Sequence, residues 1–255
     1  MACKPPGNLT IEGSINNSLE EVSAIETVPN NNLLWVIEDA GNDNHLYALN
    51  KRGKIIRDIT ITNATNEDWE DLAMDNMGNI YIGDFGNNNK KRTDYTIYKV
   101  NREDLNRGSA SAEIIQFKLP KEKKPKDFEA FFVLNKMFYL FTKTHKKLSV
   151  FSVPNTIGKH EATFLTKHKF TGKENKITAA DISNDGQSIL LLAHDGVWHL
   201  TNFSGTDFFS GSITKKEFRH NSQKEGICFF TKELIMITDE RNGYEGGNIY
   251  SFSLN

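Results

Sequence analysis

The sequence predicts an all-β protein folded as a five-bladed β-propeller, with six blades as the alternative. Two observations predict this fold: short apolar runs separated by polar turn clusters, and an anchor residue that recurs at the start of every fourth run. The anchors are acidic except for one threonine and lie 49, 59, 49 and 47 residues apart; they are Glu21, Glu70, Glu129, Thr178 and Glu225. Repeats of about 40–50 residues with four strands each are typical of β-propellers. The long second interval is the reason for the six-blade alternative.

The two ends of the chain together supply one repeat. After Glu225, 30 residues remain, which form three strands, and 20 residues precede Glu21. The alternating segment 9–15 is therefore expected to add the outer strand of the last blade. This closure pairs both ends of the chain in one sheet and removes an unpaired edge. Because a single blade would expose an apolar face, residues 9–255 are expected to form one propeller domain.

The remaining strands are expected in sets of four, bounded by turn clusters such as 29–32, 41–44 and 51–53. The first set is 21–25, 33–37, 45–49 and 54–61, and the second is 69–74, 79–83, 95–100 and 112–119. The third is 128–133, 137–141, 148–153 and 162–166, and the fourth is 177–182, 188–192, 197–200 and 213–218. The incomplete last set is 225–229, 234–237 and 248–252. Helical periodicity is weak, and only residues 102–106 are expected to form a helical turn.

Composition and charge exclude some classes of partner. The chain has 17 Phe and 7 Tyr, and its net charge is −2. Aromatic residues favour pleated strands, and a net charge this small gives no reason to expect nucleic acid or an anionic membrane surface. The basic runs at 90–92 and 121–126 lack interleaved aromatic residues, so they are interpreted as solvated loops. We expect a monomer that does not bind nucleic acid.

The two cysteines, Cys3 and Cys228, lie in different settings. Cys228 is inside an apolar run, where a free cysteine behaves as a small hydrophobic residue. Cys3 lies in a polar, proline-containing segment, 1–8, which is expected to be a disordered leader. A cysteine at the head of such a leader resembles the mature start of a bacterial lipoprotein; the other interpretation is an ordinary disordered N-terminus. No apolar run reaches the ~18 residues of a membrane span, so we expect membrane attachment only through a lipid on Cys3.

Acidic residues recur in pairs at the strand ends. Fourteen positions separate Glu70 from Asp84 and Glu225 from Asp239, and the same spacing in the third set pairs Glu129 with Lys143. In a propeller, the start of the inner strand and the end of the antiparallel second strand meet at the same end of the ring. One mouth of the channel is therefore expected to carry seven carboxylates, opposed by Lys143 and Arg241: Glu21, Asp39, Glu70, Asp84, Glu129, Glu225 and Asp239.

Such a concentration of carboxylates requires compensation by a cation, by basic partners or by raised pKa values. An oxygen-rich, nitrogen-poor set favours Ca²⁺ over Zn²⁺, and the seven residues are the candidate calcium ligands. Two other interpretations stay open: that the acidic residues only bind turn amides, or that two of them form a general acid/base pair.

Two stretches resemble known bacterial propellers. The residues EGI at 225–227, ITDER at 237–241 and NIY at 248–250 resemble segments of the SdiA-regulated group. The stretch 68–84 is similar to segments of extracytoplasmic bacterial propellers. The resemblance implies a location in the periplasm or at the cell surface, and bound calcium. More distantly, the chain resembles gluconolactonase-type propellers, in which Glu, Asn and Asp hold a central divalent ion; here Asn is missing from the matching strand ends, and Thr178 replaces one acidic anchor.

Two classes of function follow, and the sequence leaves open whether the protein is an enzyme. The first is a ligand-binding or scaffold propeller of the cell envelope, with calcium at the mouth and an unknown small ligand or protein as its partner. The second is a metal-dependent hydrolase acting on a lactone, phosphoester or glycoside, in which a cation at Glu70, Asp84, Glu225 and Asp239 polarises the substrate. The base in that hydrolase would be Glu21 or Glu129. No nucleophile constellation accompanies the carboxylates, so the first class is favoured.

Overall fold

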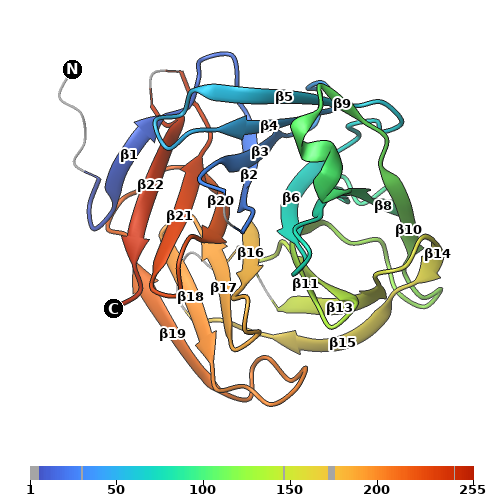
Figure 1. The fold of residues 1–255 in the computed structure, drawn as a ribbon. Coiled ribbons are helices and arrows are strands. Elements are labelled where there is room, and N and C mark those ends of the chain that lie inside the picture. The colour runs from blue at the N-terminus through green and yellow to red at the C-terminus, as the bar shows by residue number, and fades with distance from the viewer. Residues whose placement is uncertain (1–5, 30, 146, 172–175, 244) are drawn as a thin grey trace.

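Five β-sheets surround a common axis and form a five-bladed propeller (Figure 1). The computed structural model describes residues 6–29, 31–145, 147–171, 176–243 and 245–255. Each blade has one strand beside the axis, and the later strands follow outward. The predicted fold class is confirmed, with five blades rather than six. Within the described residues, no helix is long and apolar enough to cross a membrane.

The first two blades contain five strands each. From the axis outward, blade one consists of β2 (Val22–Thr27), β3 (Leu34–Glu38), β4 (His45–Leu49), β5 (Ile55–Ile61) and β9 (Ser109–Ala110). Blade two consists of β6 (Trp69–Met74), β7 (Ile80–Asp84), β8 (Asp94–Val100), β10 (Glu113–Lys118) and β14 (Gly158–Glu161).

The other three blades contain four strands each. Blade three consists of β11 (Phe128–Leu134), β12 (Met137–Thr142), β13 (Leu148–Pro154) and β15 (Thr163–His168). Blade four consists of β16 (Ala179–Ile182), β17 (Ser188–Ala193), β18 (Gly196–Thr201) and β19 (Ser212–Glu217). Blade five consists of β20 (Lys224–Phe229), β21 (Leu234–Asp239), β22 (Asn248–Ser253) and β1 (Thr10–Ser14).

The N-terminal strand closes the ring as predicted. Strand β1 pairs antiparallel with β22, from Thr10 opposite Ser251 to Ser14 opposite Asn248, so both ends of the chain lie in blade five (Figure 1). Residues 1–5 of the predicted leader 1–8, which include Cys3, lie outside the described residues. Asn8, which was assigned to that leader, donates its backbone N–H to the carbonyl of Phe218 at 2.7 Å.

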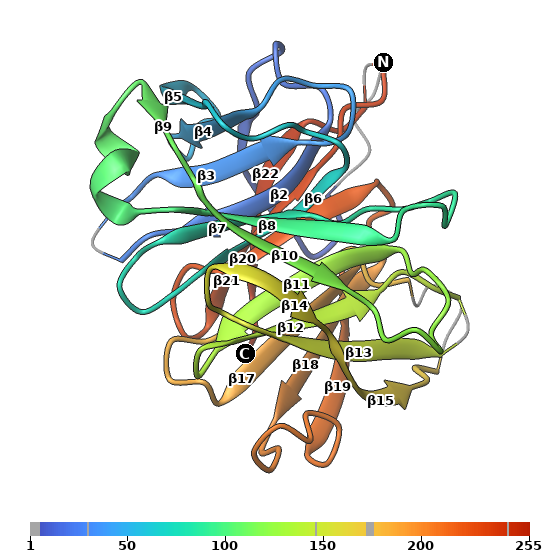
Figure 2. The same ribbon diagram turned by 90° about the vertical axis from the view of Figure 1, so that its right-hand side faces the viewer.

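Two short outer strands were not predicted, and one of them explains the long second interval. After β8, the chain forms the 3₁₀ helix η1 (Arg102–Asn106) at the predicted helical turn, and then β9 pairs in parallel with β5 of the preceding blade. Strand β14 leaves blade three and pairs in parallel with β10 of blade two, where β8, β10 and β14 lie side by side (Figure 2). These crossovers tie neighbouring blades together at the outside of the ring.

The interfaces between the blades are filled by apolar side chains. Between blades two and three, Phe85 packs edge-to-face against Phe128 and Phe131, with ring centroids 6.2 and 5.1 Å apart. This is the arrangement that the aromatic quadrupole favours. Cys228 is free and buried in the cluster between blades five and one, as expected for a small hydrophobic side chain.

Candidate metal site at the mouth of the ring

A one-residue register shift marks the start of four inner strands. The pairing of β2, β6, β11 and β20 with the next strand skips one residue each, namely Ser23, Glu70, Glu129 and Glu225. A bulged residue leaves the ladder and bends the strand. All four skipped residues line one small cavity, which lies at the end of the ring where the inner strands begin. We call this cavity the acidic mouth.

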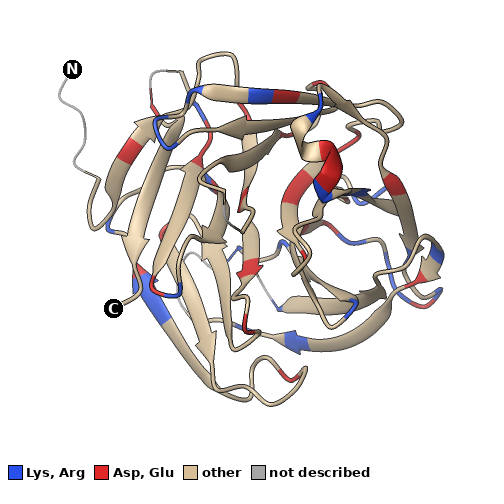
Figure 3. Ribbon diagram, in the orientation of Figure 1, with Lys and Arg blue, Asp and Glu red and all other residues tan. Residues whose placement is uncertain are grey.

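The acidic mouth has a volume of about 140 Å³. It is lined by Ser23, Asp39, Glu70, Asn88, Glu129, Lys143, Gln223, Glu225 and Glu240. Five of these nine residues are acidic and only Lys143 is basic, so the lining is strongly negative. The acidic residues of the inner strand β6, which include Glu70, are visible as a red segment near the axis in Figure 3.

Four of the seven predicted ligands lie in this lining: Asp39, Glu70, Glu129 and Glu225. Glu21 is not among the lining residues; its Oε2 atom accepts a hydrogen bond from Asn42 Nδ2 at 2.8 Å. Blade one carries Ser23 at the bulge that holds glutamates in blades two, three and five. In blade four the anchor Thr178 donates its hydroxyl to the carbonyl of Lys224 at 2.8 Å.

The last two predicted ligands, Asp84 and Asp239, lie outside the cavity lining. Asp84 accepts hydrogen bonds from Arg92 Nη1 at 2.6 Å and from the backbone N–H of Asp68 at 3.1 Å. Asp239 accepts hydrogen bonds from the Tyr250 hydroxyl and the backbone N–H of Asn248, both at 2.8 Å. Both side chains are buried and bind groups within their own blades: each accepts one backbone N–H group and one side-chain donor.

The structure adds three carboxylates that the sequence analysis missed: Asp68, Asp127 and Glu240. Asp39, Asp68 and Glu70 bring ligand atoms within 4.8 Å of one another, and so do Glu70, Asp127 and Glu129. Asp68 and Asp127 each precede a bulged glutamate by two positions, in DWE at 68–70 and DFE at 127–129. This repeated Asp-x-Glu pattern is the signal that would have found them. Glu70 belongs to both groups and is therefore the centre of the site.

The carboxylates of the mouth are only partly compensated: His194 Nε2 lies 3.1 Å from Glu225 Oε1, and Lys143 contacts Glu129. Burial raises the pKa of Asp68 to about 7, and Asp39, which shares a hydrogen bond with it, adds to the shift. Burial also raises the pKa of Glu240 to about 8, with Glu225 as the next cause. The pKa of Glu70 is raised well above its usual value by burial and then by Glu129. Raised values of this kind are expected where several carboxylates share a site without a cation.

Lys143 neutralises only part of this charge. Its Nζ atom lies 2.6 Å from Glu129 Oε2, and Glu129 is only 1% exposed. Glu129 Oε1 is also buried and has no hydrogen-bond partner among the described residues. A buried carboxylate oxygen without a donor is costly, so a cation that Glu129 Oε1 could bind would stabilise this arrangement. Gly86 keeps the site open, since a Cβ atom there would lie 2.0 Å from Glu70 Oε1.

The raised pKa values predict a pH-dependent stability of the metal-free protein. A carboxyl group whose pKa rises on folding stabilises the protein fully below its ordinary pKa, and this contribution is lost as the pH rises through the raised value. For Asp68 and Glu240 the ordinary values are 3.8 and 4.5, and the raised values are about 7 and about 8. We therefore expect the melting temperature in chelator to fall between about pH 5 and about pH 8.5.

The variant Glu240→Gln tests how much Glu240 contributes to this pH dependence. The amide does not titrate, so the decline of the melting temperature with pH should be smaller in this variant than in the wild type. Scanning calorimetry in the presence of chelator measures both profiles. Identical profiles for the two proteins would contradict the assignment of a raised pKa to Glu240.

The fold and the site together define a class of protein: a five-bladed propeller with a carboxylate-lined mouth at one end of the ring. Within that class, a family model described as SdiA-regulated matches residues 5–202. The chain therefore belongs to the SdiA-regulated family, which is the family predicted; the motifs at 225–250 lie outside the matched residues. No curated protein sequence matches the chain.

Solved structures share the fold at low sequence identity. The gluconolactonase XC5397 from Xanthomonas campestris is 11% identical, with a TM-score of 0.56, and the match covers 100% of this chain and 96% of that one. The PQQ-bound aldose sugar dehydrogenase from Streptomyces coelicolor is 9% identical, with a TM-score of 0.57 and coverage of 97% and 98%. Virginiamycin B lyase from Staphylococcus aureus is 15% identical, with a TM-score of 0.47; the match covers 92% of this chain and 66% of that one. At these identities, the first two matches support the fold alone.

Proposed function

We propose that the protein is a ligand-binding or scaffold propeller that holds a Ca²⁺ ion in its acidic mouth. The observation that carries the proposal is the meeting of two carboxylate groups at Glu70, with ligand atoms within 4.8 Å in each group. One ion beside Glu70 would be shared by side chains from blades one, two and three. It would link neighbouring blades at the place where the ring is most negative.

The donor chemistry favours calcium. The acidic residues and amides of the lining offer oxygen atoms, and no Cys or His belongs to the described lining. Ca²⁺ takes six to eight oxygen ligands in flexible geometry, whereas Zn²⁺ prefers nitrogen and sulfur. The unpartnered Glu129 Oε1 supplies one such ligand atom without the loss of an existing hydrogen bond.

Calcium is expected to raise the melting temperature of the chelator-treated protein. An ion that binds only the folded state at a hundredfold excess over its Kd stabilises it by about 2.7 kcal/mol. For a chain of this length, that stabilisation corresponds to a rise of about 5 °C or more. Glu70→Gln should remove most of the rise because Glu70 belongs to both groups, whereas Glu161→Gln, which neutralises an exposed carboxylate of β14, should retain it.

Calorimetry with added Ca²⁺, together with elemental analysis of the purified protein, measures this effect. Equal melting temperatures with calcium and with chelator, and no bound metal, would overturn the proposal. A rise that survives in Glu70→Gln would place the ion elsewhere.

The alternative, a metal-dependent lactone hydrolase, has less support. The fold similarity to a gluconolactonase favours it, but the acidic mouth, at about 140 Å³, is smaller than the roughly 300–1,000 Å³ typical of small-molecule sites. Its volume suits an ion with a few waters, and a ligand would then contact the rim. Calcium-dependent turnover of a lactone, lost in Glu70→Gln, would favour the hydrolase over the binding module.

The cellular location is also a proposal. Family resemblance supports a site outside the cytoplasm, and Cys3 is the proposed point of lipid attachment. Incorporation of labelled palmitate into the full chain, with Cys3→Ser as the control, tests the attachment independently of the calcium site.

A further inference from the structure

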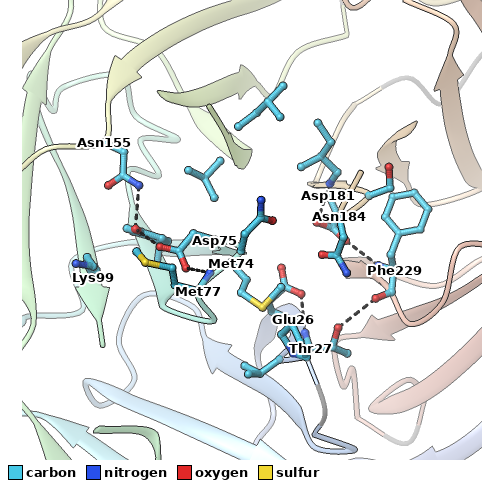
Figure 4. Close-up of a pocket in the computed structure, with 18 of the residues that line it drawn as sticks. Glu26, Thr27, Met74, Asp75, Met77, Lys99, Asn155, Asp181, Asn184 and Phe229 are labelled. Carbon is cyan, nitrogen blue, oxygen red and sulfur yellow. Dashed lines mark hydrogen bonds between the residues drawn. The ribbon is translucent and has the colours of Figure 1, made fainter. Parts of the chain in front are cut away.

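The opposite end of the ring contains a second, larger cavity (Figure 4). Its volume is about 770 Å³, which is within the range of small-molecule sites. The inner strands of blades one, four and five end at this cavity, so it faces away from the acidic mouth. The lining of this cavity includes Glu26, Met74, Lys99, Lys136, Asp181 and Phe229.

The two cavities share no lining residue, and Asp71 lies on β6 between Glu70 of the acidic mouth and Met74 of the larger cavity. The Asp71 side chain is 0% exposed. One carboxylate oxygen accepts the backbone N–H groups of Phe131 at 3.0 Å and Ala180 at 3.2 Å, and so connects β6 with β11 and β16. The larger cavity is therefore a site distinct from the acidic mouth.

Glu26 is the unusual group in the larger cavity. Its side chain is only 3% exposed, and Figure 4 shows its carboxylate directed into the cavity. Oε1 accepts the backbone N–H of Thr27 at 2.6 Å, while no described residue donates a hydrogen bond to Oε2. A carboxylate oxygen that opens into a cavity and receives no donor from the described residues is able to accept a hydrogen bond from a bound ligand.

The charges around Glu26 have one sign. Burial raises the pKa of Glu26, and the neighbouring carboxyl groups of Asp181 and Asp71 raise it further; no basic group contributes. The lining also contains two lysines: Lys99 on β8 is paired with Glu113 at 3.1 Å, and Lys136 lies in the turn after β11. The part of the cavity around Glu26 and Asp181 is thus negative, while the lining as a whole also carries two lysines.

We propose that this cavity binds a small organic monoamine as its ammonium ion. The ammonium group donates one hydrogen bond to Glu26 Oε2, and its remaining N–H groups have polar lining residues such as Asn184 within the same cavity. The carbon chain lies against Met74 and Phe229. A metal ion is a poorer occupant, because both Asp181 oxygens already accept backbone N–H groups, from Ile182 and Phe229, each at 2.7 Å.

The choice of a monoamine follows from charge and space. A neutral polyol would leave the Glu26 carboxylate without a counter-charge. A polyamine would bring further positive charges towards Lys99 and Lys136. A single ammonium group at the end of an apolar chain gives Glu26 a counter-charge and brings no further positive charge towards Lys99 and Lys136.

Isothermal titration with n-butylammonium chloride tests the proposal, with 1-butanol as the neutral probe and spermidine as the polyamine. We expect n-butylammonium to bind more tightly than either. Glu26→Gln keeps an acceptor for the Thr27 N–H but removes the charge, and should weaken n-butylammonium binding about tenfold or more. Glu70→Gln, at the other end of the ring, should bind n-butylammonium as the wild type does, which separates this site from the calcium site.

Met74→Trp gives a second test that leaves the carboxylate in place. The larger side chain occupies the cavity, so n-butylammonium binding should be lost while Glu26 keeps its charge. Circular dichroism melts establish that both variants are folded. The proposal is overturned if 1-butanol or spermidine binds as tightly as n-butylammonium, or if the folded Glu26→Gln variant binds n-butylammonium with unchanged affinity.

Discussion

We expect Asp71→Ala to lower the free energy of unfolding by about 3–5 kcal/mol, the range found when one partner of a buried polar network is removed. Asp71 is fully buried and accepts three backbone N–H groups, from Leu72, Phe131 and Ala180. Alanine would leave all three donors without a partner close to the axis. The melting temperature should fall by about 10 °C, as measured by calorimetry in the presence of Ca²⁺.

Asp71→Asn is the matched control. The amide keeps the volume and one acceptor oxygen, so its destabilisation should be smaller than that of alanine. The burial of the carboxylate opposes the stabilisation by these hydrogen bonds. Burial raises the pKa of Asp71 well above its usual value despite the three donors. An Asp71→Ala variant as stable as the wild type would show that this cost outweighs the hydrogen bonds.

Leu9→Ala is expected to cost about 2–4 kcal/mol, as for other buried leucines. Leu9 is 4% exposed and immediately precedes β1. It belongs to the apolar cluster between blades four and five, which includes Phe218 and Tyr250. The truncation leaves a cavity where the first segment of the chain meets the last blade, so the closure of the ring should be weakened.

Ile11→Ala, in the same strand, is the control. Ile11 is 51% exposed, and its truncation should change the free energy of unfolding by less than about 0.5 kcal/mol. Urea unfolding of both variants measures the difference. Equal losses in the two variants would mean that β1 stabilises the ring through its backbone pairing alone.

The fold could be predicted from the sequence because each blade repeats the same pattern at nearly constant spacing. Even the closing strand β1 was expected, since the two ends of the chain complete one period. Strands β9 and β14 could not be predicted in the same way. They have two and four residues, and each pairs with a strand of the preceding blade, so their pairing depends on the assembled ring.

The candidate site was predictable only in part. Glu70, Glu129 and Glu225 were found because they recur at the starts of apolar runs. Glu21 was chosen as the fourth copy because it also precedes an apolar run, but the register places Ser23 at the equivalent bulge. A bulge depends on how two strands pair, and the sequence of one strand does not reveal it. The hydrogen bonds of Asp84 and Asp239 likewise depend on partners from later parts of the chain, Arg92 and Tyr250.

At the bulges, the residues that determine the charge of the acidic mouth are not the residues that form the ladder pairs between the inner strands. A skipped residue has no partner in the register between the two inner strands, so its side chain can change without the loss of a ladder pair. The bulged residue is serine in blade one and glutamate in blades two, three and five. The charge of the mouth can therefore be altered one blade at a time without the loss of a ladder pair in the ring.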